Sequence, residues 1–254
     1  MADEMRTGFS SEDNWRVATV VEALAQYLPP GNFALGVGMA LRYLLAERNL
    51  DHPSHEFKDL DLLLPEPGAI SSDMAQEGSG FIFTHYHPPT HPYKYLVGNF
   101  FIKALHVPTR TKVDFFSFSP FPPGSFDSIG FFGADMMAPM AESLLVVTLL
   151  DLQKLLEANG NAPKKRLDSL KLLLQITDFG KAEEVWGKHF NGQSTLTSNI
   201  ESILKLSEEQ SEKFITKSSG KKPIARCGDC YDDPKFPLAS REAARAALGL
   251  PQLT

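Results

Sequence analysis

The sequence has only two cysteines, Cys227 and Cys230, arranged as Cys-Gly-Asp-Cys. A Cys-x-x-Cys pair is typical of a redox centre or of half a zinc site. Zinc needs four ligands, and all seven histidines lie well upstream of the pair. No strand–helix pattern of the thioredoxin type surrounds it. We interpret the pair as a polar turn with reduced thiols; a zinc ion completed by distant histidines or by a partner chain is the alternative.

The sequence also lacks long hydrophobic runs and an excess of positive charge. No apolar run reaches the ~18 residues that a membrane-spanning helix needs. The first residues, MADEMRTGFSSEDNW, are acidic and polar, unlike a secretory signal, so we expect a cytoplasmic protein with no membrane partner. The formal net charge is −6. A general attraction to nucleic acid is therefore absent, and any contact with RNA needs a local basic patch.

The composition that remains is that of an ordinary globular protein. Of the 254 residues, 43% are hydrophobic and 22% are charged, which excludes a disordered chain. This length allows one large domain or two modest ones. Because the composition changes near Ala138, we predict an α/β domain over residues 1–136 and a mostly helical domain over residues 137–254.

Hydrophobic periodicity predicts the elements of each half. In the first half it predicts helices over 12–28, capped by Ser11, over 39–48 and, briefly, over 70–77. It predicts strands over 33–35, 58–64, 80–87, 95–106 and 111–118. Residues 120–133 are rich in Phe, Pro and Gly, so we expect an irregular excursion there. In the second half helices are predicted over 141–158, 164–177 and 241–248.

The strand after the second helix carries two carboxylates, Asp59 and Asp61, separated by Leu60. Side chains alternate between the faces of a strand, so both aspartates project to one face. Two carboxylates on a largely apolar strand repel each other and lose solvation. A divalent cation is the simplest compensation, and hard oxygen ligands suit Mg²⁺.

A glycine turn precedes this strand by about twenty residues. Gly36 and Gly38 flank Val37, and Met39 begins the predicted helix. Glycines let the backbone approach a ligand closely, and a helix N-terminus offers free N–H groups and a positive dipole end to a phosphate. The alternative interpretation is a tight turn without a ligand. The carboxylate pair downstream favours phosphate binding.

Two further groups are candidates for metal ligands. Asp114 is a single carboxylate flanked by Val113, Phe115 and Phe116, either a third ligand or an exposed residue on an edge strand. His85 and His87 lie two residues apart in another predicted strand, so they share a face. They are candidates for metal binding, but such residues are more often surface or partner contacts.

The succession of strand, glycine turn, helix, Asp-x-Asp strand and third carboxylate resembles the nucleotidyltransferase fold of the DNA polymerase β superfamily. Within it, the sequence is most similar to the AbiEii-type nucleotidyltransferase toxins. The resemblance implies an α/β (α+β) fold, with a mixed sheet, flanking helices and a mostly helical C-terminal half. Asp59, Asp61 and Asp114 would then be catalytic and hold Mg²⁺ or Mn²⁺. His55 and Phe57 depart from the family pattern of Arg followed by Ser or Thr, which removes a hydroxyl near the phosphates.

The same resemblance extends to basic residues. It implies that Lys154 and Lys165 bind triphosphate oxygens together with Lys58 and the turn Gly36–Met39, and that Asp168 holds Lys165 or Lys154 in place. Lysine supplies the point charge that such oxygens attract. The alternative for Lys154, Lys165 and Asp168 is a solvated helix face.

The implied activity is transfer of a nucleoside monophosphate from an NTP to an acceptor hydroxyl. The toxin resemblance implies a tRNA 3′ end as acceptor and an antitoxin as partner. The basic runs Lys164–Arg166 and Lys221–Lys222 are the sequence features that support RNA. The alternatives are a protein or an aminoglycoside as acceptor, or a non-catalytic binding module. Three clustered carboxylates argue against the last of these, because without a cation they only repel one another.

Overall fold

A computed structural model describes residues 8–52, 57–87, 99–159, 162–189, 194–214 and 251. The first of its two compact units contains the chain as far as Pro120 together with Phe126–Ala138. The second contains Phe121–Ser125 and the helices that follow Pro139. No helix in these described ranges is long and apolar enough to cross a membrane. Four features of the sequence analysis lie outside the described residues: the cysteine pair, the helix predicted over 241–248, Lys221–Lys222 and His55.

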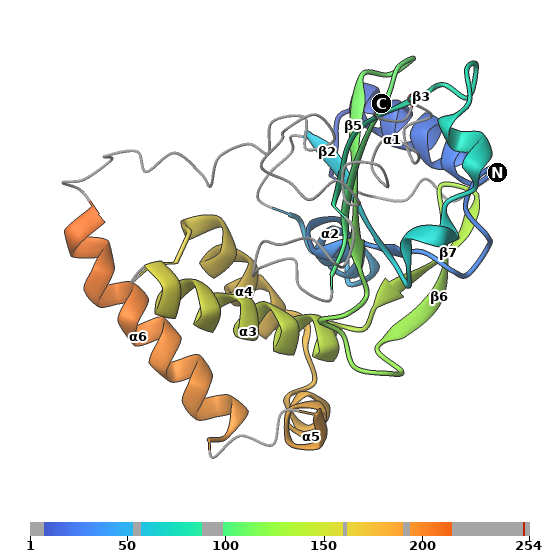
Figure 1. The fold of residues 1–254 in the computed structure, drawn as a ribbon. Coiled ribbons are helices and arrows are strands. Elements are labelled where there is room, and N and C mark those ends of the chain that lie inside the picture. The colour runs from blue at the N-terminus through green and yellow to red at the C-terminus, as the bar shows by residue number, and fades with distance from the viewer. Residues whose placement is uncertain are drawn as a thin grey trace. The chain divides into compact units, whose positions relative to one another are not determined.

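The first unit is built on a mixed seven-stranded sheet with the order β3-β4-β5-β2-β1-β7-β6 (Figure 1). Strand β2 runs parallel to β5 and β1 runs parallel to β7, whereas the pairs β1–β2, β3–β4 and β4–β5 are antiparallel. The predicted mixed sheet is therefore confirmed. The strands are β1 Ala34–Leu35, β2 Asp59–Leu64, β3 Phe81–His87, β4 Phe101–His106, β5 Thr111–Ser117, β6 Phe126–Phe131 and β7 Ala134–Pro139.

One face of the central strands forms the core of this unit. Leu60, Leu62 and Leu64 of β2 are fully buried, as are Val113 and Phe115 of β5. Burying each large apolar side chain stabilises the fold by about 1.5–3 kcal/mol. Because side chains alternate, this packing fixes the opposite face of both strands as the one that carries the charged residues.

Helix α1, Ser11–Leu24, is capped one residue earlier than predicted. Its N-cap is Ser10, whose Oγ accepts a hydrogen bond from the backbone N of Asp13 at 3.1 Å. The prediction of Ser11 was wrong because either serine fits the local pattern and only the backbone conformation selects between them. The helix ends at Leu24, and the next residues turn back onto its last carbonyls. Both α1 and α2 lie beside the sheet (Figure 1).

The irregular excursion predicted over 120–133 is partly wrong. Residues 126–131 form β6, which pairs with β7, and the turn between them places Phe132 and Gly133 at positive φ. Aromatic and glycine residues obscured the alternation that marks a strand, because β6 lies at the end of the sheet and exposes several of its residues. The short helix predicted over 70–77 is instead a pair of 3₁₀ turns, η1 Pro67–Ala69 and η2 Ser72–Ala75.

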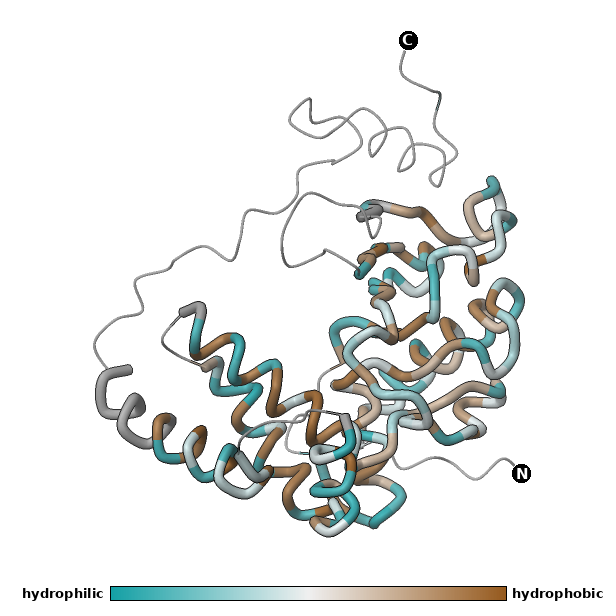
Figure 2. Tube along the Cα trace, turned by 60° about the horizontal axis from the view of Figure 1, so that its bottom comes forward, coloured by the Kyte–Doolittle hydropathy of each residue, from teal (hydrophilic) through white to brown (hydrophobic). Residues whose placement is uncertain are grey.

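The second unit is helical, as predicted. It contains α3 Ala141–Asn159, α4 Lys164–Ile176, α5 Phe179–His189 and α6 Leu196–Phe214. Their hydropathy alternates along the chain (Figure 2), and the hydrophobic side includes the buried residues Leu144, Leu149, Leu170 and Leu173. Amphipathic helices of this kind derive most of their stability from packing against each other.

A buried histidine in the first unit makes its stability depend on pH. His106 Nδ1 lies 2.8 Å from Thr109 Oγ1, and that hydroxyl donates to Thr111 Oγ1 at 2.8 Å. Burial lowers the pKa of His106 below its ordinary value of 6.5. A histidine with a lowered folded-state pKa takes up its proton more readily when the protein unfolds, so its neutral form stabilises the fold above pH ~6.5 and this stability is lost as the pH falls.

We therefore expect the free energy of unfolding to decrease between about pH 7.5 and pH 5. A His106→Asn variant, which keeps an N–H donor near Thr109 but does not titrate, should show a flatter pH dependence. Urea unfolding at the two pH values measures the free energy of unfolding of wild type and of the variant. An equal decrease in wild type and variant would contradict the assignment to His106.

Candidate active site

Four polar side chains form a row across four neighbouring strands of the first unit. Asp61 of β2 pairs with Asp114 of β5, and Asp114 pairs with Lys103 of β4. Lys103 in turn pairs with His85 of β3, just after an irregularity in that strand. Residues directly opposite each other on adjacent strands project to the same face, with Cβ atoms about 4.5–5.5 Å apart. The pairing register thus brings together Asp61 and Asp114, which are far apart in the sequence.

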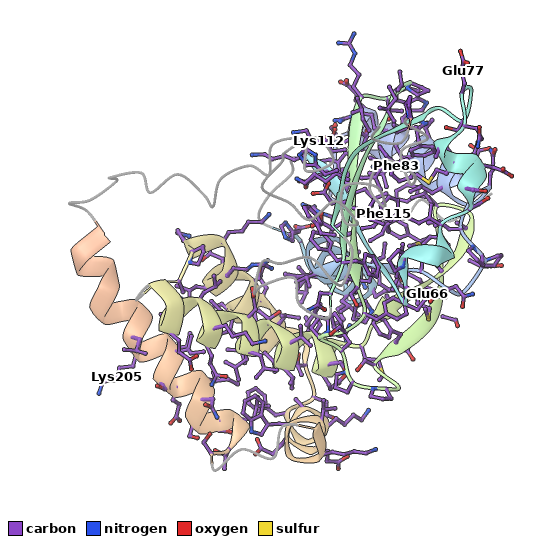
Figure 3. The ribbon with its side chains drawn as sticks, viewed as in Figure 1. Glu66, Glu77, Phe83, Lys112, Phe115 and Lys205 are labelled. Carbon is purple, nitrogen blue, oxygen red and sulfur yellow. The ribbon has the colours of Figure 1, made fainter. Side chains whose placement is uncertain are left out.

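Asp59 lies two residues before Asp61 on the same face of β2, opposite Lys112 of β5. Lys112 and Phe115, both labelled in Figure 3, are three positions apart in β5, so they lie on opposite faces of the strand. The exposure of the carboxylates decreases along this face. Asp59 is exposed, Asp61 is half-buried and Asp114 is buried. We call this surface, with Asp59, Asp61, Asp114, Lys103 and Lys112, the carboxylate face.

The Asp114 carboxylate is only partly compensated. Its Oδ2 lies 3.4 Å from Lys103 Nζ, whereas its Oδ1 is buried and has no hydrogen-bond partner within the described ranges. Burial raises the pKa of the Asp114 carboxyl above its ordinary value; the charge of Lys103 opposes this shift, and the charge of Asp59 adds to it. Leaving a buried carboxylate oxygen without a partner costs free energy. A bound ligand would remove this cost.

The glycine turn is pressed against this face. The Gly36 N–H donates to the Asp61 carbonyl at 2.8 Å, and a Cβ on Gly36 would lie 2.5 Å from Asp61 Cβ. Only glycine permits this approach. Helix α2, Val37–Glu47, begins here with Gly36 as its N-cap, and no side chain caps it and no acidic residue occupies its first turn. The N-terminus of α2 and its positive dipole end therefore begin next to Asp61.

The predicted helix began at Met39, but α2 begins two residues earlier, at Val37. Gly38 therefore lies within the helix rather than in the turn. It is exposed, and a Cβ at this position would have no neighbour within 4 Å. The two glycines have different roles: Gly36 permits the contact with β2, and Gly38 leaves the first helical turn uncovered.

Phe57, which replaces a hydroxyl residue of the family pattern, is buried in the first unit. The Arg16 guanidinium lies 5.2 Å from the centre of the Phe57 ring. The backbone N of Phe57 donates to Asp13 Oδ2 at 3.4 Å. Phe57 therefore anchors the segment before β2 to α1. Lys58 follows it and is exposed.

The other predicted phosphate ligands belong to the second unit. Lys154 lies on α3, and Lys165 and Asp168 lie on α4, where Asp168 pairs with Lys164 at 2.6 Å. The expectation that Asp168 holds Lys165 or Lys154 is therefore wrong for the structure described. Residues three and four apart are both neighbours on a helix, and of the two lysines Asp168 pairs with Lys164, four positions before it. A role of Lys154, Lys165 and Asp168 in binding phosphate stays a prediction.

The residues of the carboxylate face fit a divalent cation whose remaining ligands are substrate phosphates and water. No three His, Cys, Asp or Glu side chains among those described are grouped so as to hold a metal ion. Mg²⁺, however, is usually bound by one or two carboxylates plus substrate phosphates and water, not by a complete protein cage. Asp61 and Asp114 supply two carboxylates in direct register, and Asp114 Oδ1, which has no hydrogen-bond partner in the described part of the chain, is a hard oxygen ligand.

Sequence reasoning missed Lys103. The alternation of Phe101, Lys103 and Leu105 places all three on one face of their strand. Which strand lies next to them, and in which register, depends on tertiary pairing. The pairing puts Lys103 against Asp114 and stacks Phe101 on Phe116, with ring centroids 4.9 Å apart.

The fold and the site together define an α/β protein whose mixed sheet carries three aspartates on one face, followed by a helical unit. No family model matches the sequence, and no curated protein matches it significantly. Among solved structures, the fold is similar to that of an antigenic nucleotidyltransferase-like protein from Paracoccidioides brasiliensis. The identity is 16% and the TM-score 0.44, and the match covers 82% of this chain and 95% of that one. Function is therefore inferred from the geometry of the carboxylate face.

Proposed function

We propose that this protein is a metal-dependent nucleotidyltransferase, which transfers a nucleoside monophosphate from an NTP to an acceptor hydroxyl. The observation that carries the proposal is the direct pairing of Asp61 with Asp114 beside the N-terminus of α2. This arrangement combines hard oxygen ligands with a phosphate-binding helix end. It also agrees with the resemblance of the sequence to the DNA polymerase β superfamily.

In this proposal the N–H groups of Gly36–Met39 bind the β- and γ-phosphates, because the first N–H groups of a helix have no partner within the helix. Lys58, in the same unit, neutralises part of the remaining phosphate charge. A role of Lys154, Lys165 and Asp168 of the second unit in binding phosphate stays a prediction that the resemblance implies. The aspartates bind the metal that accompanies the nucleotide.

The reaction is a displacement at the α-phosphorus. The acceptor oxygen forms the new O–P bond, the bond from phosphorus to the pyrophosphate oxygen breaks, and the hydroxyl proton passes to the Asp114 carboxylate. When bound, Mg²⁺ or Mn²⁺ would lower the pKa of the acceptor hydroxyl and stabilise the charge on the leaving pyrophosphate. Asp59, Asp61 and Asp114 are the residues that would hold the ions.

The acceptor we favour is an RNA 3′ end, in line with the resemblance to AbiEii-type toxins, and an antitoxin is the corresponding partner. A cationic small molecule such as an aminoglycoside is the second candidate. Its support is the net charge of −6, which attracts cations and repels nucleic acid at long range.

The test is a transfer assay with purified full-length protein, Mg²⁺ or Mn²⁺, each α-labelled NTP in turn, and total bacterial RNA. The Asp59→Ala/Asp61→Ala protein is the control. Label in RNA of tRNA size, lost in the control, is the expected result and identifies the base. Label on protein or on an added aminoglycoside would identify the other acceptors. Absence of both transfer and nucleotide binding would refute the proposal in favour of a binding module for another ligand.

A further inference from the structure

Lys103 places a cation directly against a predicted metal ligand. Its ammonium lies 3.4 Å from Asp114 Oδ2, and the Lys103 and Asp114 side chains are 36% and 12% exposed. The ammonium also lies 4.9 Å from the centre of the Phe101 ring. That ring stacks on Phe116, with an interplanar angle of 22°. The aromatic pair and the carboxylate together hold the ammonium at this position.

The sheet order determines the direction from which each group approaches Asp114. Strand β5 lies between β4 and β2, so Lys103 approaches Asp114 from one side and Asp61 lies on the other. An ion bound by Asp61 and Asp114 together would lie on the β2 side, close to the N-terminus of α2. The ammonium of Lys103 compensates the Oδ2 side of Asp114, and Asp114 Oδ1 stays without a hydrogen-bond partner among the residues described.

We propose that Lys103 is the resident counter-ion of Asp114 and competes with the divalent cation for this carboxylate. The inference rests on the proposed function in taking Asp114 as a metal ligand. Lys103 is a positioning residue, since it acts through Asp114. While Lys103 is in place, Asp114 is held by a monovalent cation that repels any divalent ion binding nearby.

The consequence is a site that binds the metal weakly until the nucleotide is present. Phosphate oxygens then add ligands and negative charge on the β2 side, which shifts the competition toward the metal. Once released from Asp114, the Lys103 ammonium stays on the β4 side, away from the triphosphate. Metal and nucleotide are therefore expected to bind together rather than in sequence.

The test measures Mn²⁺ binding directly, by the electron paramagnetic resonance signal of free Mn²⁺, with full-length protein and no nucleotide. The pH is kept at about 8, well above the ordinary pKa of aspartate. The variants are Lys103→Met, Lys103→Gln, Lys103→Arg and, as a matched control, Lys112→Met. Lys112 is an exposed lysine on the carboxylate face whose charge also acts on Asp114.

We expect Lys103→Met and Lys103→Gln to bind Mn²⁺ roughly tenfold more tightly than wild type, because one like charge beside the ion has been removed. Lys103→Arg should bind like wild type, and Lys112→Met should change the affinity by less than about twofold, since solvent screens its charge. Adding Asp114→Asn to Lys103→Met should abolish the gain, which would locate the effect at Asp114.

The inference would be overturned if Lys103→Met and Lys103→Gln bound Mn²⁺ no more tightly than wild type. It would also be overturned if none of the proteins bound Mn²⁺. The transfer assay separates this result from failure of the proposed function. Transfer by wild type together with unchanged Mn²⁺ affinity in the variants would overturn only the competition. Tighter Mn²⁺ binding in the variants without transfer by wild type to any acceptor would overturn only the nucleotidyltransferase proposal.

Discussion

Replacing Asp61 with asparagine is expected to reduce nucleotide transfer roughly 1,000-fold or more, the effect of removing a preorganised electrostatic group from an active site. Asp61 lies between the two halves of the proposed site. Its carbonyl accepts the Gly36 N–H at the start of α2, and its side chain lies in register with Asp114. Asparagine keeps the shape of the side chain but removes the charge that holds the metal. The measurement is the initial rate of label transfer from the preferred NTP at saturating Mg²⁺.

The matched control is Asp135→Asn, which removes an exposed carboxylate from β7 of the same sheet. It should retain full activity. Thermal unfolding should show that Asp61→Asn is at least as stable as wild type, because the substitution relieves repulsion among carboxylates. Full metal-dependent turnover by Asp61→Asn would exclude the proposed mechanism, whatever its stability.

Gly36→Ala is expected to destabilise the first unit strongly and to displace the site. The added Cβ would lie 2.5 Å from Asp61 Cβ and 2.7 Å from the Asp61 carbonyl oxygen. Because these neighbours are at or next to the backbone of a buried strand, they cannot move aside as a flexible side chain does. Overpacking of this kind costs about 1–3 kcal/mol and occasionally more. Any shift of β2 also moves Asp61, so transfer should fall further than the fraction of unfolded protein explains.

Gly38→Ala is the matched control for this prediction. Gly38 lies two residues further along, within α2, and a Cβ there meets no atom within 4 Å. Alanine in an exposed helical position is favoured over glycine by up to about 1 kcal/mol, so this variant should be as stable as wild type or more so. Urea unfolding of the two variants measures the difference. Equal stability of Gly36→Ala and wild type would show that Gly36 and Asp61 of β2 do not approach each other as closely as described.

The sequence by itself determined the features that depend on local geometry. The alternation of Asp59, Leu60 and Asp61 predicted which face of β2 is charged, and that face agrees with the burial of Leu60. The helices α3 and α4 follow from hydrophobic periodicity, and the start of the helix after the glycine turn was predicted to within two residues. In each case the decisive interactions lie within one or two turns of chain, where spacing fixes which residues share a face.

Only the tertiary structure decided which strands are neighbours and in what register. The pairing of Asp61 with Asp114, the position of Lys103 between Asp114 and His85, and the addition of β6 and β7 to the sheet follow from it. A shift of one residue in β5 would turn Asp114 to the apolar face and Phe115 to the carboxylate face. The burial of Val113 and Phe115 against the rest of the core excludes that register. Because this selection depends on residues distant in the sequence, no local pattern contains it.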